Sequence, residues 1–144
     1  MGGATAAGGL SRGAMRFLLI CLGGAVGTGA RYGVGGLCAR WLGADFPYGT
    51  LVVNVLGSFL IGFIQQVGLT TLAIPDTARL VLTIGVMGGF TTYSSFSYET
   101  LRLVEEGSWL QAAINVVATT GLCLGVCALG LALGRIVVGW KGGL

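Results

Sequence analysis

The sequence GGFTTYSSF, residues 88–96, interrupts a strongly apolar part of the chain. Its two glycines, two threonines and two serines are poor components of a plain lipid-facing helix. Glycine weakens helices, and threonine hydroxyls compete for backbone partners. We therefore predict that Gly88-Gly89, followed by Phe90-Thr91-Thr92, interrupts the helix. Irregular backbone at membrane depth survives only where protein or an aqueous cavity covers it. The break thus predicts a functional cavity, with a simple kink as the alternative.

The composition predicts an all-α membrane protein. Mean hydropathy is +0.89, with 54% hydrophobic and only 9% charged residues. Because a bilayer core takes roughly 20 apolar residues per helix, the chain divides into four segments, residues 15–39, 47–72, 78–104 and 109–138. We expect one four-helix transmembrane domain over residues 15–139, a flexible N-terminal tail over 1–14 and a short C-terminal tail over 140–144.

Several function classes are excluded by what the sequence lacks. The chain has no histidine, and its four cysteines show no C-x-x-C spacing, so a transition-metal site is not expected. Without a Ser-His or Cys-His dyad, a hydrolytic enzyme is not expected either. The net charge of +3 is too dispersed to indicate nucleic-acid binding.

Polar residues recur at helical spacing inside two of the predicted spans. One set is Thr50, Asn54 and Ser58, and the other is Asn115, Thr119 and Cys123. Residues four apart share one helical face, so two such faces predict a polar path between the helices. Asn54 lies among aliphatic residues, where an amide needs partners. Two interpretations stay open for it, a bond between helices and a donor facing a hydrated pathway.

Charged residues are expected only at the ends of this path. Arg31 either snorkels to the interface or holds the mouth of the path at positive potential. The nearest carboxylate, Glu99, follows the polar run by one to two turns. A path without titratable groups favours passive permeation of a small anion or neutral solute over proton-coupled exchange.

The break itself offers groups for ions of both signs. A broken helix exposes carbonyls that can bind a small cation and N–H groups that can meet an anion. Tyr93 and Phe96 are three residues apart, so their rings share a face. Ring edges carry partial positive charge and can border an anion path.

Small residues four apart predict close helix packing. The pairs are Gly23 and Gly27, Gly29 and Gly33, Ser58 and Gly62, Gly85 and Gly89, Gly121 and Gly125, and Gly130 and Gly134. In lipid, helices associate through such small residues. Four spans enclose little interior, so we expect a homo-oligomer with cavities near subunit contacts.

The distribution of cationic residues favours termini in the cytoplasm. With four spans, both termini share one side with Arg12, Arg16, Arg79, Arg135 and Lys141, whereas Arg40 and Arg102 lie on the other. Cytoplasmic segments carry the excess of Lys and Arg. The excess is modest, and insertion in both orientations stays open.

Taken together, these motifs resemble the Fluc (CrcB-type) fluoride channels. The run GGFTTYSSF is similar to that family's G-G-x-T-T-F-S-T-F signature. The other landmarks follow in order, GGAVGTGARYG in the first segment, GTLVVNVLGSFLIGF in the second and INVVATTGLCLG in the fourth. The resemblance covers residues 16–135.

The resemblance implies a dual-topology antiparallel homodimer in the cell inner (plasma) membrane, with four helices per subunit and the third broken near the midplane. It implies two pores for passive fluoride efflux, which would lower cytoplasmic fluoride and its toxicity. It also implies a structural sodium ion, not transported, on the carbonyls of Gly88 and Thr91. The pore positions map to Asn54 with Thr50, to Tyr93, Ser94, Ser95 and Phe96, and to Asn115 and Thr119, with Arg31 in the vestibule. Tyr93 replaces the usual Phe, and Asn115 a frequent Tyr.

Two other classes remain as alternatives. A small multidrug-type exporter is also an antiparallel dimer of four short helices, but it relies on a glutamate in the first helix, and residues 15–39 contain no acidic residue. In a noncatalytic membrane assembly subunit, the polar faces would only bind a partner protein.

Overall fold

The computed structural model describes residues 11–71 and 74–141, and every element in that part of the chain is a helix. The elements are α1 (Arg12–Leu42), α2 (Tyr48–Thr70), α3 (Asp76–Leu80), the π-helix η1 (Val81–Met87), α4 (Gly88–Phe90), α5 (Tyr93–Glu105) and α6 (Trp109–Lys141). The predicted all-α fold is confirmed.

Three helices, α1, α2 and α6, are long and apolar enough to cross a membrane among the described residues. The third predicted segment instead consists of two helical stretches, Asp76–Phe90 and Tyr93–Glu105, separated by Thr91 and Thr92. The outer boundaries also differ from the prediction. α1 begins at Arg12, inside the predicted tail of residues 1–14, and α6 reaches Lys141. The rest of the two predicted tails, residues 1–10 and 142–144, lies outside the described residues.

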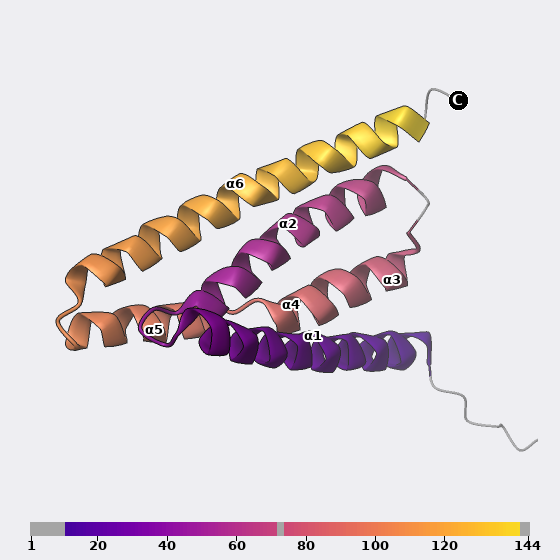
Figure 1. The fold of residues 1–144 in the computed structure, drawn as a ribbon. Helices are drawn as coiled ribbons and strands as arrows, with labels where there is room; N and C mark the ends of the chain where they lie inside the picture. Colours follow the sequence, from indigo (N-terminus) through magenta and orange to yellow (C-terminus); the bar gives the residue numbers. More distant parts are fainter. Residues whose placement is uncertain (1–10, 72–73, 142–144) are drawn as a thin grey trace, which may run out of the picture.

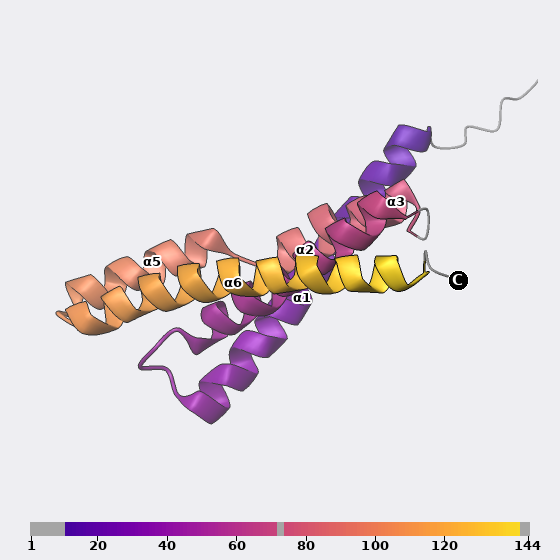
Figure 2. The same cartoon turned by 90° about the horizontal axis from the view of Figure 1, so that it is seen from above.

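Helix α2 occupies the middle of the fold, between α6 on one side and α1 with η1 on the other (Figure 1). The start of α1, the end of α2 and the end of α6 lie at one end of the molecule (Figures 1 and 2). The end of α1, the start of α2 and the turn between α5 and α6 lie at the opposite end (Figures 1 and 2). The two groups of cationic residues that the sequence assigns to opposite sides of the membrane therefore lie at opposite ends of the long axis.

Glycines permit the close contact of α1 with η1 and α4. A Cβ atom built on Gly27 would overlap the carbonyl oxygen of Val86, and one built on Gly89 would overlap the carbonyl oxygen of Gly24. In lipid, where apolar side chains gain little by leaving their surroundings, such backbone proximity provides much of the attraction between helices. A similar contact joins α2 to α6, where Gly130 lies against the carbonyl of Phe59.

Two of the predicted glycine pairs do not take part in packing within the subunit. Gly29 and Gly33 on α1, and Gly121 and Gly125 on α6, have no described atom within 4 Å of a built Cβ. The spacing of small residues identified the close contacts of the fold correctly in the other pairs but cannot say which partner each face meets.

The helix break lies at the end of the predicted run, at Thr91 and Thr92. Gly88 and Gly89 are helical in α4, and the chain becomes extended at Thr91 (ψ 159°) and Thr92 (φ −153°). Gly89 is required where α4 packs on α1, whereas Thr92 accepts a hydrogen bond from the Ser95 N–H at 3.2 Å as the N-cap of α5. Threonine is a favoured N-cap, so the polar residues, not the glycines, determine where the helix stops and restarts.

Candidate functional site

Asn54 of α2 holds the extended segment between α4 and α5. Its side-chain oxygen accepts the backbone N–H of Thr92 at 2.7 Å, and its Nδ2 donates to the carbonyl of the same residue at 3.0 Å. Both residues are buried. The break removes the helical acceptor of the Thr92 N–H, and a buried unpaired N–H is costly, so the amide oxygen of Asn54 compensates for the interruption.

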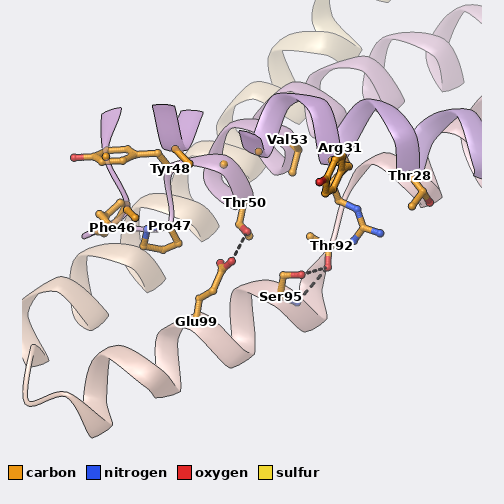
Figure 3. A pocket seen from close by; sticks show the side chains of 16 residues that line it. Thr28, Arg31, Phe46, Pro47, Tyr48, Thr50, Val53, Thr92, Ser95 and Glu99 are labelled. Atoms are coloured by element: carbon orange, nitrogen blue, oxygen red, sulfur yellow. Dashed lines mark hydrogen bonds between the residues drawn. The ribbon is translucent and has the colours of Figure 1, made fainter. Parts of the chain in front are cut away.

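A first cavity of about 440 Å³ borders Thr92 (Figure 3). Its lining comes from α1, the segment before α2, the start of α2, the break and α5, and its polar side chains are Thr28, Arg31, Tyr32, Tyr48, Thr50, Thr92, Ser95 and Glu99. A water molecule takes about 30 Å³ in the liquid, so the cavity has room for an ion with much of its hydration shell. Arg31, Thr50 and Ser95 were predicted site residues, and this cavity brings them together.

Glu99 lines the first cavity together with Arg31, so this cavity has one carboxylate and one guanidinium group in its lining. Thr50 donates a hydrogen bond to Glu99 Oε1 at 2.9 Å, and Figure 3 shows the two side chains pointing toward each other. The second oxygen, Oε2, is buried and has no hydrogen-bond partner among the described residues. The signal was available in the sequence, because Thr92, Ser95 and Glu99 recur at intervals of three and four residues, which places them on one face of a helix.

A second cavity, of about 390 Å³, also borders the break. Asn54 and Thr92 contribute to its wall. The remaining polar lining comes from α2, η1, the break, α5 and α6, and consists of Ser58, Thr83, Thr91, Tyr93, Thr119, Thr120 and Cys123. Thr92 lines both cavities and Asn54 lines the second, and most of the polar side chains in the two linings carry hydroxyl groups.

The two aromatic residues after the break touch each other but differ in exposure. The ring centroids of Tyr93 and Phe96 are 5.5 Å apart, with an angle of 53° between the planes, so the rings are tilted rather than stacked. Phe96 is buried, whereas Tyr93 is 81% exposed on the isolated subunit. Both line the second cavity, where ring edges can face an ion. The predicted residue between them, Ser94, is exposed at the start of α5 and shares a hydroxyl contact of 3.2 Å with Thr92.

The two predicted polar residues of α6 lie in different surroundings. Thr119 lines the second cavity and donates to the side-chain oxygen of Asn115 at 3.2 Å. Asn115 is only 1% exposed and is not among the described residues that line either cavity. Its Nδ2 donates to the hydroxyl of Thr100 on α5 at 2.8 Å. The spacing of four residues therefore placed the pair on one face, as expected, but only Thr119 reaches open space.

The break also leaves backbone oxygen atoms for a cation. In a continuous helix the carbonyl of Gly88 would accept the N–H of Thr92, but that N–H donates to Asn54. Gly88 is exposed and Thr91 is half-buried, and both line the second cavity. Carbonyl oxygens are ligands for hard cations such as sodium, so these two residues fit the predicted ion in chemical type.

Comparison with known proteins identifies the family. Residues 18–131 match the pattern of the CrcB-like protein family, Camphor Resistance (CrcB). The chain belongs to the CrcB family. Similar CrcB relatives include proteins named fluoride-specific ion channel FluC. The one from Sorangium cellulosum is 50% identical over 123 residues, which is 85% of this chain and 97% of the relative.

Two further relatives with the same name extend the comparison. The protein from Anaeromyxobacter sp. (strain K) is 56% identical over 109 residues, covering 76% of this chain and 86% of the relative. The protein from Roseiflexus sp. (strain RS-1) is 45% identical over 123 residues, covering 85% of this chain and 99% of the relative. With three apolar helices long enough to span a bilayer, this CrcB chain is a multi-pass membrane protein and not an enzyme.

Proposed function

We propose that this protein is a fluoride-specific ion channel that lets fluoride leave the cell passively and so lowers its cytoplasmic concentration. The observation that carries the proposal is the pair of polar cavities that both border Thr92, the residue bound by Asn54. Relatives with 45% to 56% identity are named fluoride-specific ion channels. Two cavities that border one buried residue are what an ion path needs, namely two aqueous approaches and a short dehydrated passage.

The chemistry of the lining suits a small, strongly hydrated anion. Fluoride must exchange its water for hydrogen-bond donors at close range, and it must not be held by a fixed charge so strongly that it cannot leave. Thr92 and Asn54 can present donors in the narrow passage, and the edges of Tyr93 and Phe96 border the second cavity. The positive end of the α5 dipole also points at the break, because α5 starts there.

We assign the residues along the path as follows. Arg31 lies in the first cavity, which serves as the vestibule, together with Thr50 and Ser95. Asn54 stands at the passage, and Tyr93, Phe96 and Thr119 line the second cavity. Ser94 lies beside the passage at the start of α5. The predicted pore residue Asn115 is engaged within the subunit, and its role is treated separately below.

The fourth span and the dimer belong to the proposal as well. Asp76–Phe90 and Tyr93–Glu105 together cross the membrane as one interrupted span, and the subunit pairs with an antiparallel second copy. Two features support this. The glycine pairs at Gly29 and Gly33 and at Gly121 and Gly125 meet nothing within the subunit. Tyr93, next to a buried Phe96, is 81% exposed at the edge of a polar cavity. A second copy would complete the wall of that cavity.

The structural sodium ion is proposed for the dimer axis. The carbonyls of Gly88 and Thr91 from two subunits would supply four oxygen ligands, a set that suits a hard cation. The ion would hold the two breaks together and would not be transported.

A liposome efflux assay tests the proposal. Purified protein is reconstituted in liposomes loaded with potassium fluoride or potassium chloride, and anion release is followed with ion-selective electrodes after valinomycin is added. We expect release of fluoride and retention of chloride. Equal release of both anions would reject a fluoride-specific channel, and proton-driven uptake of an organic cation would support the multidrug-type exporter instead.

A further inference from the structure

We propose that Asn115 is a positioning residue that holds α5, and with it the ring of Phe96, against α6, and that it does not contact the permeating ion. This inference rests on the proposed fluoride path. Its basis is a chain of three hydrogen bonds that connects α6 to the backbone carbonyl of Phe96, and whose two middle members, Asn115 and Thr100, line neither cavity.

The chain of hydrogen bonds uses both ends of the Asn115 amide. Thr119 Oγ1 donates to Asn115 Oδ1 at 3.2 Å, and Asn115 Nδ2 donates to Thr100 Oγ1 at 2.8 Å. Thr100 Oγ1 in turn donates to the carbonyl of Phe96 at 2.7 Å. Asn115 is 1% exposed, and the bonds at its oxygen and nitrogen lie in a place that the cavities do not reach. An ion could reach this amide only if these bonds were broken.

The chain lies in the middle of the contact between the two helices. Phe96, Thr100 and Leu103 share one face of α5 by their spacing of four and three residues, and Phe96 and Leu103 are buried. Ala112, Asn115 and Thr119 share one buried face of α6 in the same way. The bond between Thr100 and Asn115 therefore fixes the rotation of α5 one turn after Phe96, whose ring lines the second cavity. Apolar packing alone would tolerate small rotations of α5.

The test is a double-mutant cycle on fluoride efflux. We expect Asn115→Ala and Thr100→Val each to lower efflux about tenfold, since breaking one hydrogen bond to a buried group changes an equilibrium by roughly that factor. The double variant should lose no more than either single one, because both remove the same contact. Thr100→Ser keeps the hydroxyl and should conduct like the unmodified protein. Ser97→Ala is the matched control, because its hydroxyl bonds only within α5, to the carbonyl of Tyr93.

Direct contact with the ion predicts a different pattern. In that case Asn115→Ala would lower efflux while Thr100→Val would leave it unchanged, and the losses would multiply with those of Thr119→Val. That pattern would overturn the inference.

A second readout does not depend on conduction. 4-Fluorophenylalanine is placed at position 96, and its ¹⁹F resonance is recorded in each variant. Asn115→Ala and Thr100→Val should shift or broaden the resonance alike, whereas Ser97→Ala and Thr100→Ser should not. Unchanged spectra in the first two variants would refute the positioning role. If the unmodified protein released no fluoride, the proposed function would fail, and the ¹⁹F spectra would still decide whether Asn115 positions Phe96.

Discussion

Asn54 and Thr92 are 38 residues apart in the chain, yet the amide of one makes two hydrogen bonds with the peptide group of the other. The contact joins the middle of α2 to the break in the third predicted span. It gives the N–H of Thr92 a new acceptor where the helix is interrupted, and it holds the residue that both cavities border. Stability of the break and passage of the ion therefore depend on the same side chain.

Asn54→Asp should abolish fluoride efflux. A carboxylate can still accept the N–H of Thr92, but it cannot donate to the Thr92 carbonyl, and it places a negative charge in the passage of an anion. Efflux from liposomes and the elution volume in gel filtration are measured together. An unchanged elution volume would show that the assembly is retained, and efflux within twofold of the unmodified protein would contradict the assigned role.

Phe96→Ile should also abolish efflux, because an aliphatic side chain fills similar space without the positive ring edge. The matched comparison is Tyr93→Phe, which keeps a ring beside Phe96 and removes only the hydroxyl. We expect Tyr93→Phe to conduct fluoride. If Phe96→Ile conducted normally in the liposome assay, the aromatic border of the second cavity would have no part in permeation.

Gly27→Ala should lower stability, because the added methyl group would overlap the carbonyl oxygen of Val86. Overpacking of this kind costs about 2 kcal/mol, and we expect a fall of about 5 °C in the thermal midpoint followed by circular dichroism in detergent. Gly36→Ala is the control, since a Cβ there has no described atom within 4 Å. Equal thermal midpoints for the two variants would mean that the close contact of α1 with η1 does not contribute to the stability of the fold.

Arg31→Gln should slow efflux most at low ionic strength. Arg31 lines the first cavity, and a cation at the mouth of a path raises the local concentration of anions. At about 1 M salt the screening length falls to about 3 Å, so the difference from the unmodified protein should shrink. Arg40→Gln is the control on the same helix, because Arg40 does not line either cavity among the described residues. A salt-independent loss would indicate a structural role for Arg31.

Removal of sodium should destabilise the assembly. A ligand that binds only the folded state stabilises it by mass action, so replacing sodium with N-methyl-D-glucamine should lower the thermal midpoint. The Phe96→Ile variant provides the control, since its backbone carbonyls at Gly88 and Thr91 are unchanged and it should keep the sodium dependence without conducting. Identical midpoints in both cations would remove the proposed sodium site.

The sequence predicted the parts of the fold that depend on local pattern. The length of the apolar segments predicted α1, α2 and α6, and the polar run at residues 88–96 predicted an interruption in the third segment. It also placed Asn54 and Thr50 on one face of α2, and both line the site.

The remaining features depend on contacts between distant residues. The break falls at Thr91 and Thr92 for two reasons. Gly89 must stay in the helical stretch that packs against Gly24 of α1, and the acceptor for the freed N–H of Thr92 is Asn54 on another helix. The hydrogen bond between Glu99 and Thr50 could not be predicted from local pattern, because Thr50 precedes Glu99 by 49 residues. Asn115 was expected to face the path, but Thr100 on α5 binds its amide instead.

The seven-residue π-helix Val81–Met87 links the glycine contact on α1 to the start of the break. π-Helical turns accommodate one more residue per hydrogen-bonded ring than α-helical turns do. Shortening this stretch by a single residue would rotate everything after it by about 100° relative to α1. Gly89 would then leave Gly24, and Thr92 would face away from Asn54. The register of this π-helix therefore determines whether Gly89 can pack against Gly24 on α1 while Thr92 binds the amide of Asn54 on α2.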